Sequence, residues 1–320
     1  MATTVSITTT ERTPEPAVGV LEEVVCDACG SETSTPVLQR PDALRVVECE
    51  RCGLMYLSPR PKANAIESWY CGDYFSGDAA RVGRGYADYL AQDALADLRL
   101  IARQKLVIVS RHIRLKGAAV LELGCATGET CYAASQEGAR IVGCDLSLDV
   151  IQVARRRYPG LDFQVASTEH LPFATASFDA VLAFELIEHV SSPSAFVREV
   201  YRVLRPGGML VLTTPNVECG RTVGWNQWTG FLTSFEHLYF FDSKTLGRAV
   251  SQTGMSIVGI YSQGEGRITK PNAATFKSVL RRLRLFGPMK AMYRAVLGLP
   301  EGQWLSSDAL HTLMMVARKT

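Results

Sequence analysis

The stretch Val120-Leu-Glu-Leu-Gly-Cys-Ala-Thr-Gly-Glu129 determines the fold of this chain. An apolar run from Ala118 to Leu123 is typical of a buried parallel strand. It leads directly into a turn of small residues, after which Glu129 to Glu137 has the composition of a helix. Such a turn lets a ligand lie against bare backbone, and the start of a helix offers unpaired N–H groups. The sequence therefore predicts a strand–turn–helix unit that binds a ligand at its turn.

The small residues of this turn do not match two common nucleotide-binding patterns. A dinucleotide-binding turn has glycine at the positions that Ala126 and Glu129 occupy here. A P-loop ends in Gly-Lys-Ser or Gly-Lys-Thr, and this turn does not. The turn fits close contact with a ligand better than it fits phosphate binding. A nicotinamide-dependent oxidoreductase is therefore the less favoured enzyme class.

The next acidic residue along the chain indicates a ribose contact. Ala139 to Cys144 has the pattern of a second strand, and Asp145 ends it. In doubly wound sheets, a carboxylate roughly 20 residues beyond the glycine turn reaches the ribose hydroxyls of a nucleotide. We therefore expect Asp145 to hold the ribose of a bound cofactor.

Four segments in order resemble the motifs of class I S-adenosylmethionine-dependent methyltransferases. They read Glu-Leu-Gly-Cys-Ala-Thr-Gly (122–128), Gly-Cys-Asp-Leu-Ser (143–147), Leu-Pro-Phe-Ala-Thr-Ala-Ser-Phe-Asp (171–179) and Val-Leu-Arg-Pro-Gly-Gly (203–208). The resemblance covers about residues 115–320. It implies an enzyme with an α/β, doubly wound, seven-stranded Rossmann-like sheet and S-adenosyl-L-methionine as cofactor. The cofactor-binding positions that it implies are Glu122, Gly124, Ala126, Gly128, Asp145, Leu146, Ser167, Thr168 and Glu185.

One of these positions departs from the family. Where related enzymes carry an aspartate that contacts the adenine amino group, this chain has Ser167. A serine hydroxyl can still accept a hydrogen bond, so we keep Ser167 as an adenine contact. The remaining strands are predicted at 161–165, 180–184, 209–214, 255–261 and 311–317.

Four of the nine cysteines form a doubled pair. Cys26-x-x-Cys29 and Cys49-x-x-Cys52 are each followed by a glycine. Two thiolates at this spacing grip one tetrahedral ion, and the glycine lets the knuckle fold back. The pattern predicts a zinc ribbon with one structural Zn²⁺ and no open coordination position. Disulfides are the alternative, which nothing in the sequence favours because no secretory signal precedes the pairs.

The sequence divides into four parts. We expect a disordered Thr-rich tail at 1–20, a zinc-ribbon module at 21–60, a helical lid or linker at 61–116, and the methyltransferase domain at 117–320. The lid carries an aromatic cluster that either covers the cofactor or packs the ribbon onto the domain: Trp69, Tyr70, Tyr74 and Phe75. A second aromatic stretch, Trp225 to Phe231, contacts substrate or forms a hydrophobic plug.

A basic amphipathic segment interrupts the domain at 265–305. Residues 266–300 contain eight Lys or Arg and no Asp or Glu. Three interpretations remain open: solvated helices over the sheet, a site for an anionic substrate, or a membrane-surface contact. The formal net charge of +2 gives no case for nucleic-acid binding. With no apolar run long enough to span a membrane, we expect a cytoplasmic protein. The sequence does not indicate its oligomeric state.

The acceptor side is predicted at the end of the fourth strand. If the chain turns helical after Phe184, then Glu185, Glu188 and His189 lie on one face. His237 comes later and reaches the same edge. This set is similar to the metal site of small-RNA terminal 2′-O-methyltransferases and to the Glu-His segment of ubiquinone-pathway O-methyltransferases. The resemblance implies a second metal, Mg²⁺ or Mn²⁺, held by these four residues.

A metal-free mechanism stays open beside this one. In it Glu188, His189 and His237 form the catalytic group, with one histidine as general base. Either mechanism fits O-methylation of an anionic or aromatic small molecule in biosynthesis, with sugar-linked and nucleotide-linked metabolites among the candidates. C- or N-methylation is the alternative reaction. A non-catalytic zinc-ribbon binding protein is the alternative of another class.

Overall fold

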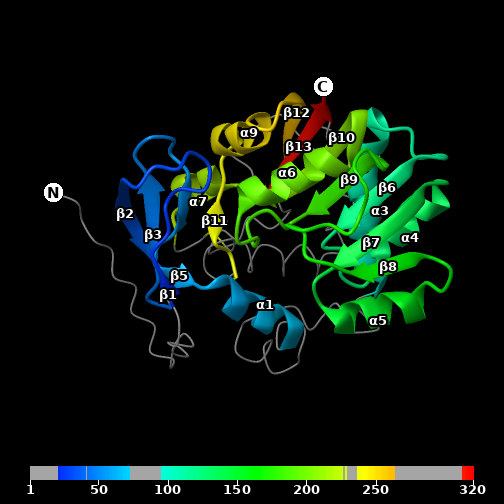
Figure 1. Cartoon of the computed structure of the whole chain (residues 1–320), viewed down its shortest axis with the longest axis horizontal. Helices are drawn as coiled ribbons and strands as arrows, with labels where there is room; N and C mark the ends of the chain where they lie inside the picture. Colours follow the sequence, from blue (N-terminus) through cyan, green and yellow to red (C-terminus); the bar gives the residue numbers. More distant parts are fainter. Residues whose placement is uncertain (1–20, 41, 73–94, 226–227, 229–235, 264–311) are drawn as a thin grey trace, which may run out of the picture.

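The computed structural model describes residues 21–40, 42–72, 95–225, 228, 236–263 and 312–320. Figure 1 shows a small N-terminal group of strands beside a larger layered unit built on a twisted sheet. The predicted tail, part of the predicted lid including Tyr74 and Phe75, and the basic segment lie outside the described residues.

The larger unit is a seven-stranded sheet with the order β12-β13-β10-β9-β6-β7-β8. β6, β7, β8, β9 and β10 run parallel, while β13 is antiparallel to both of its neighbours, β10 and β12. This confirms the predicted fold class. The strands are β6 (Ala119–Leu123), β7 (Arg140–Asp145), β8 (Asp162–Val165), β9 (Phe178–Phe184), β10 (Leu204–Pro215), β12 (Met255–Gln263) and β13 (Thr312–Lys319).

Alternate residues of the central strands face two different hydrophobic layers, as the two-residue period of a strand requires. In β9, Val181 and Ala183 belong to one cluster, whereas Ala180 and Leu182 belong to the other. The first cluster includes residues of α6 (Pro193–Val203) and α9 (Ser243–Ser251). The second includes residues of α3 (Leu95–His112), α4 (Glu129–Gln136) and α5 (Leu148–Arg157). The sheet is therefore covered on both faces.

Side-chain caps mark the starts of α6 and α9. Ser192 accepts a hydrogen bond from the Ala195 amide, and proline follows it at the first helical position of α6. Asp242 and Thr245 form a reciprocal capping box at the start of α9. These caps fix where the chain turns away from the carboxyl edge of the sheet.

The N-terminal strands form a four-stranded sheet with the order β11-β4-β3-β2. Its fourth strand comes from the larger unit, since Tyr239 pairs with Tyr56 and Phe240 with Met55. Figure 1 shows this yellow strand between the blue strands and the central sheet. The strands are β2 (Ser34–Gln39), β3 (Arg45–Cys49), β4 (Met55–Leu57) and β11 (Tyr239–Phe240), with β1 (Leu21–Glu22) and β5 (Arg60–Pro61) paired separately.

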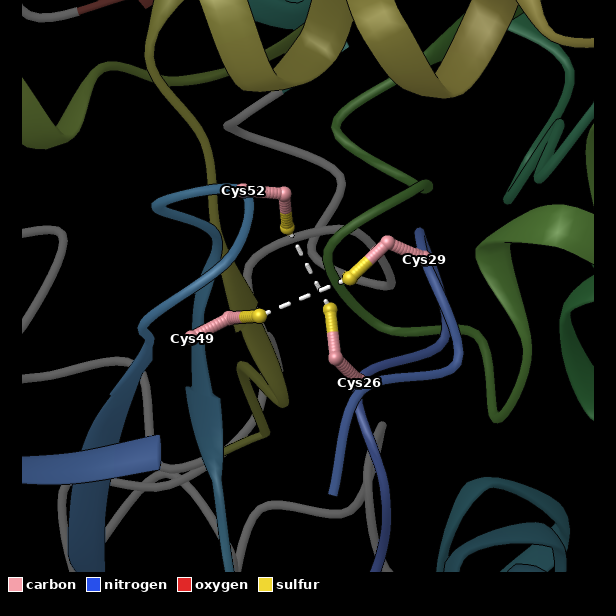
Figure 2. Close-up of side chains that lie close together, drawn as sticks. All are labelled: Cys26, Cys29, Cys49 and Cys52. Atoms are coloured by element: carbon pink, nitrogen blue, oxygen red, sulfur yellow. Dashed lines mark hydrogen bonds between the residues drawn. The ribbon is translucent and has the colours of Figure 1, made fainter. Parts of the chain in front are cut away.

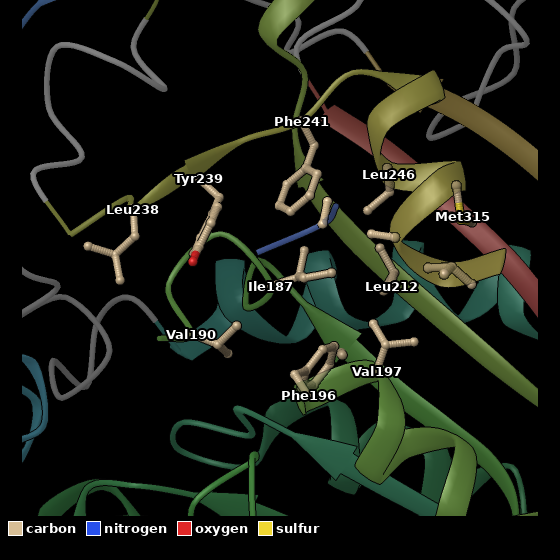
Figure 3. Packing of buried hydrophobic residues seen from close by; sticks show 14 of the residues in the cluster. Ile187, Val190, Phe196, Val197, Leu212, Leu238, Tyr239, Phe241, Leu246 and Met315 are labelled. Atoms are coloured by element: carbon tan, nitrogen blue, oxygen red, sulfur yellow. The ribbon is translucent and has the colours of Figure 1, made fainter. Parts of the chain in front are cut away.

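The two units share one hydrophobic core. Val46, Leu54 and Leu57 of the N-terminal unit belong to the same cluster as Leu212 and Phe196 of the larger unit. Figure 3 shows the part of this cluster where residues 238–241 pack against α6, α9 and β10. Two further helices, α1 (Ala63–Gly72) and α7 (Val217–Val223), complete the described elements. Within the residues that the structure describes, no helix is both long and apolar enough to cross a membrane.

Candidate functional site

The turn between β6 and α4 has the tight backbone that its small residues predict. Gly124, Ala126 and Gly128 have φ angles of +69°, +44° and +89°. Gly128 is the N-cap of α4, and a Cβ atom there would lie 2.7 Å from the Phe163 ring. No side chain larger than hydrogen fits at Gly128 without displacing that ring. The turn thus presents bare backbone and the amino end of a helix at the carboxyl edge of the sheet.

Asp145 ends β7 beside this turn. Its two carboxylate oxygens accept hydrogen bonds from the Ala126 amide (3.0 Å) and the Ser147 amide (3.0 Å). Burial raises the pKa of Asp145, while these amides act in the opposite direction. Because a carboxylate offers about four acceptor positions, Asp145 can hold the turn and still receive hydroxyl donors from a ligand.

The other predicted cofactor positions surround the same edge. Ser167 and Thr168 follow the end of β8, and the Ala166 amide donates to the Asp145 carbonyl (3.0 Å). Leu146 directly follows β7. Strand ends therefore bring these positions together, although they are distant in sequence, as the topology of a doubly wound sheet requires.

Glu122 lies beneath the turn. It is buried and accepts a hydrogen bond from the Cys131 thiol of α4, with an Sγ–Oε2 distance of 3.0 Å. Burial raises the pKa of Glu122 to about 7, although the Cys131 thiol and the Lys105 ammonium act to lower it. In this position Glu122 joins β6 to α4 and supports the turn from within.

Lys105 of α3 is a charged residue near this edge that the sequence reasoning missed. Its Nζ lies 4.7 Å from the centroid of the Phe184 ring at the end of β9. Burial lowers the pKa of Lys105, and the carboxylates of Glu185, Glu122 and Glu188 act to raise it. A lysine within a helical apolar repeat is typical of a solvated face, so the sequence contained no signal for this placement.

On the acceptor side, Glu188, His189 and His237 come together. Each offers one ligand atom, and these atoms all lie within 4.8 Å of one another. The imidazoles of His189 and His237 meet edge to face, with centroids 4.7 Å apart. The Nε2 atom of His189 lies 3.6 Å from Oε1 of Glu188. The later histidine, His237, therefore lies beside Glu188 and His189 in the structure.

The helix considered after Phe184 does not form. Residues 187–189 make a turn, Glu185 has a φ of +51°, and α6 begins only at Pro193. Glu185 is exposed and is not part of the group of close ligand atoms. The expectation that Glu185, Glu188 and His189 share a helical face is thus wrong. The physical reason is that the Ser192 cap and the following proline place the helix start further along the chain.

Burial determines the charge states of the acceptor-side group. The side chains of Glu188 and His189 are 1% and 10% exposed. Burial raises the pKa of Glu188 well above its usual range, and the Glu185 carboxylate adds to the shift. Burial also lowers the pKa of His189, as does the neighbouring His237. His189 is therefore neutral at neutral pH, with a ring nitrogen able to bind a cation or a proton.

Two observations fit a divalent cation in this group. Among the described residues, neither side-chain oxygen of Glu188 has a hydrogen-bond partner. A buried polar group in that state costs free energy unless it is paired. The Nδ1 atom of His189 contacts the Tyr70 hydroxyl at 2.6 Å, which fixes the ring and leaves Nε2 for a ligand. Tyr70, one of the aromatics of the predicted lid, therefore contacts the acceptor-side group through His189.

The four N-terminal cysteines gather around one point, as Figure 2 shows. The Sγ atoms of Cys26 and Cys52 are 3.4 Å apart, and those of Cys29 and Cys49 are 3.5 Å apart. These distances exclude S–S bonds of about 2.05 Å. They are close to the roughly 3.8 Å expected between sulfurs of a tetrahedral Zn–S₄ site with bonds of about 2.3 Å.

Glycines shape both cysteine knuckles as predicted. The amides of Gly30 and Gly53 donate to the carbonyls of Cys26 and Cys49, at 2.7 and 2.9 Å. The two glycines have φ angles of +68° and +77°, which favour glycine. The donor set, its geometry and its knuckles all fit a closed zinc site.

The aromatic stretch after α7 contributes to the core. Trp228 is 1% exposed, with its ring centroid 6.4 Å from that of Phe240 and 5.9 Å from that of Trp225. For Trp228 the structure supports the hydrophobic plug. Residues 226–227 and 229–235 lie outside the described residues.

Comparison with known proteins agrees with this geometry. Residues 121–212 match the methyltransferase domain family. A Mycolicibacterium smegmatis protein named "Probable S-adenosylmethionine-dependent methyltransferase" is 38% identical over 103 residues, which cover 32% of this chain and 40% of the relative. The ubiquinone biosynthesis O-methyltransferase of Xanthomonas oryzae pv. oryzae is 38% identical over 117 residues, which cover 35% of this chain and 49% of the relative. This chain thus spans less than half the length of either relative.

A solved structure supports the fold. The complex of the Trm112 methyltransferase activator with a methyltransferase, from Haloferax volcanii, matches with a TM-score of 0.53 and 21% identity. The match covers 78% of this chain and 97% of the other. Residues 121–212 thus match a methyltransferase domain family, and the seven-stranded sheet that contains them has the Rossmann-like fold of that solved structure.

Proposed function

We propose that the protein is an S-adenosylmethionine-dependent methyltransferase that methylates an oxygen atom of a small-molecule acceptor. The observation that carries the proposal is the position of the Glu188, His189 and His237 group. It lies at the same carboxyl edge as the turn that carries Gly124 and Gly128. A cofactor site beside a buried acid and two imidazoles suits deprotonation and alkylation of a hydroxyl group. The name of the Xanthomonas relative supports oxygen as the acceptor atom.

S-adenosylmethionine supplies an activated methyl group, so the protein has to bind, align and deprotonate. In the proposed site the backbone of Gly124, Ala126 and Gly128 lies against the cofactor. Asp145 accepts hydrogen bonds from the ribose hydroxyls and, at the same time, holds the Ala126 amide. Ser167 and Thr168 border the adenine. Lys105 adds a positive charge near this edge, close to Glu122 and Glu185.

The proposed acceptor site holds a divalent cation between Glu188, His189 and His237. Such a cation lowers the pKa of a bound hydroxyl. One carboxylate and two imidazoles favour Mn²⁺, Fe²⁺ or Zn²⁺ over Mg²⁺, which prefers oxygen ligands. The Tyr70 hydroxyl orients His189 through Nδ1. If no cation binds, His237 is the preferred general base.

The cysteine site is proposed to hold one structural Zn²⁺ through Cys26, Cys29, Cys49 and Cys52. All four ligand positions are filled by protein sulfur, so no position is open for substrate. The ion contributes to folding of residues 21–60.

Mass spectrometry of freshly purified, denatured protein tests this proposal. We expect S-adenosylmethionine or S-adenosylhomocysteine to be released. An accompanying metabolite with a hydroxyl group would name the acceptor class. Release of a nicotinamide dinucleotide would contradict the proposal and favour an oxidoreductase. Absence of any binding to S-adenosylhomocysteine, with zinc retained, would favour a non-catalytic zinc-ribbon protein. An acceptor with only a carbon or nitrogen nucleophile would redirect the reaction to C- or N-methylation.

A further inference from the structure

We infer that Arg40 of the cysteine module, residues 21–60 with the four clustered cysteines, is a positioning residue for His237 at the acceptor site. The guanidinium Nη1 of Arg40 donates to the backbone carbonyl of His237, with a distance of 2.9 Å. Arg40 lies in the hairpin between β2 and β3, far from His237 in sequence. This inference rests on the proposed role of His237, although its test reads the position of the ring directly.

Arg40 is built rigidly into the interior. Its Nε donates to Oδ1 of Asp42 at 3.1 Å and its Nη2 to Oδ2 at 2.5 Å. The side chains of Arg40 and Asp42 are 1% and 5% exposed. The Asp42 carboxylate also accepts from the Leu44 amide, at 3.3 Å. A guanidinium fixed by a bidentate pair cannot rotate freely, so its Nη1 group is held in one direction, toward the His237 carbonyl.

The peptide groups around His237 are held from two sides. The amides of Leu238 and Tyr239 donate to the carbonyl of Glu188, at 2.8 and 3.2 Å. The carbonyl of Leu238 accepts from the amide of Leu57 in the cysteine module, at 2.9 Å. Together with the Arg40 contact, these bonds fix the backbone that carries the imidazole. They also tie the backbone of Glu188, a second member of the acceptor-side group, to the same segment.

Side chains that follow His237 strengthen this arrangement. Leu238, Tyr239 and Phe241 enter the same hydrophobic cluster as Ile187 and Val190, as Figure 3 shows. The loop that carries Glu188 and His189 therefore packs directly on the segment that carries His237. A displacement of this segment changes the distance between the ligand atoms of the group.

A second contact joins the cysteine module to the loop that follows His189. Asp27, between Cys26 and Cys29, accepts from the Ser194 amide at 2.6 Å and from the Ser192 hydroxyl at 2.6 Å. Arg60 donates to the Ser191 carbonyl at 2.9 Å. The module thus contacts both segments of the acceptor-side group. Among these contacts, Arg40 is the one that reaches the backbone of a group member.

Histidine NMR tests the inference, because the chain has only five histidines. The ring signals of full-length protein labelled at histidine are compared between wild type and three variants, and His237→Gln assigns the signal of interest. The double variant Arg40→Met/Asp42→Asn removes both charges of the buried pair, so that neither is left unpaired. In this variant the NMR signals of His237 and His189 should move by more than a linewidth. Those of His112 and His170 should stay in place and show that the protein is folded. Arg45→Met is the matched control, since Arg45 is a half-exposed arginine of the same module, and it should leave all signals in place.

Arg40→Lys supplies the rescue arm. A lysine keeps the charge and can still donate to the His237 carbonyl, so its His237 signal should lie between those of wild type and the double variant. If the double variant does not fold, Arg40→Lys decides alone: it must move the His237 signal more than Arg45→Lys does. An unmoved His237 signal in the folded double variant, or in Arg40→Lys where the double variant does not fold, would overturn the inference. Calorimetry of wild-type protein with S-adenosylhomocysteine tests the proposed function separately. The NMR result does not depend on cofactor binding, so either prediction can fail while the other holds.

Discussion

The backbone carbonyl of Glu188 accepts a hydrogen bond from the amide of Leu238, with a distance of 2.8 Å. The bond joins the turn after β9 to the segment before β11, which also completes the sheet of the cysteine module. Three distant parts of the chain therefore meet at the group formed by Glu188, His189 and His237.

Loss of the Asp145 carboxylate should weaken cofactor binding without unfolding the protein. We expect Asp145→Ala to cost about 1.5–3 kcal/mol of binding free energy to S-adenosylhomocysteine, the range for a hydrogen bond to a charged group. That corresponds to a roughly 10- to 150-fold weaker dissociation constant, measured by calorimetry. Asp149→Ala is the control, because Asp149 is an exposed carboxylate in the first turn of α5. Equal affinities for the two variants would remove Asp145 from the ribose site.

A side chain at the turn should block the cofactor. Gly124→Val places a β-branched residue at a φ of +69°, and its Cβ would already lie 3.1 Å from Leu186. We expect loss of measurable S-adenosylhomocysteine binding, because the backbone can no longer approach the ligand. Gly160→Val is a control at another positive φ, with no atom near its Cβ position. Binding retained in Gly124→Val would mean that the cofactor does not lie against this turn.

The sequence could predict the sheet because its strands are apolar and regular. β6 starts one residue from its predicted position, and β9 starts two residues before Ala180. The cysteine knuckles could also be predicted, since Cys-x-x-Cys-Gly encodes its own local geometry. The prediction of a helix directly after Phe184 overlooked a signal in the sequence. Ser192 and Pro193 form a helix-start signal, which indicates that the helix begins only at Pro193.

Contacts between distant segments could not be predicted from one sequence. Arg40 and His237, or Tyr70 and His189, belong to parts of the chain with no shared periodicity. The same holds for Lys105, because the apolar periodicity of α3 does not show which carboxylates this lysine approaches. These contacts depend on how the helices and the two sheets pack together in the folded chain.

The pH dependence of stability should report the burial of Glu122. Burial raises its folded-state pKa to about 7, from the 4.5 of an exposed glutamate. The folded state therefore binds more protons than the unfolded state between these values, so the contribution of Glu122 to stability is lost as pH rises through this window. The shift corresponds to about 3 kcal/mol. In urea unfolding, Glu122→Gln should gain stability relative to wild type from pH 4.5 to pH 7. A difference that stays constant with pH would contradict the prediction.

Removal of a cysteine ligand should release zinc. We expect Cys29→Ser to lose the ion and to destabilise residues 21–60, because structural zinc contributes folding free energy directly. Elemental analysis gives the metal content, and hydrogen exchange of peptides from β3 and β4 gives the local stability. Cys219→Ser is the control, a buried cysteine in α7 outside the cluster. Wild-type protein without zinc and with two disulfides would refute the assignment.

The acceptor-side group should bind Mn²⁺ when the ion is added alone. Electron paramagnetic resonance of zinc-loaded protein should show one site, and Glu188→Gln should weaken it by more than the roughly 10- to 100-fold loss typical of a supporting contact. Glu199→Gln is the control, a carboxylate of α6 that pairs with Arg202. If wild type binds no Mn²⁺, and elemental analysis finds no Fe²⁺ and no Zn²⁺ beyond the one ion of the cysteine site, the cation is excluded and His237 stands as the general base.

The most direct test of the central claim is a calorimetric titration of wild-type protein with S-adenosylhomocysteine and, separately, with NAD⁺. We expect one site per chain for S-adenosylhomocysteine and no heat of binding for NAD⁺. Binding of NAD⁺, or no binding of S-adenosylhomocysteine to folded, zinc-containing protein, would contradict it.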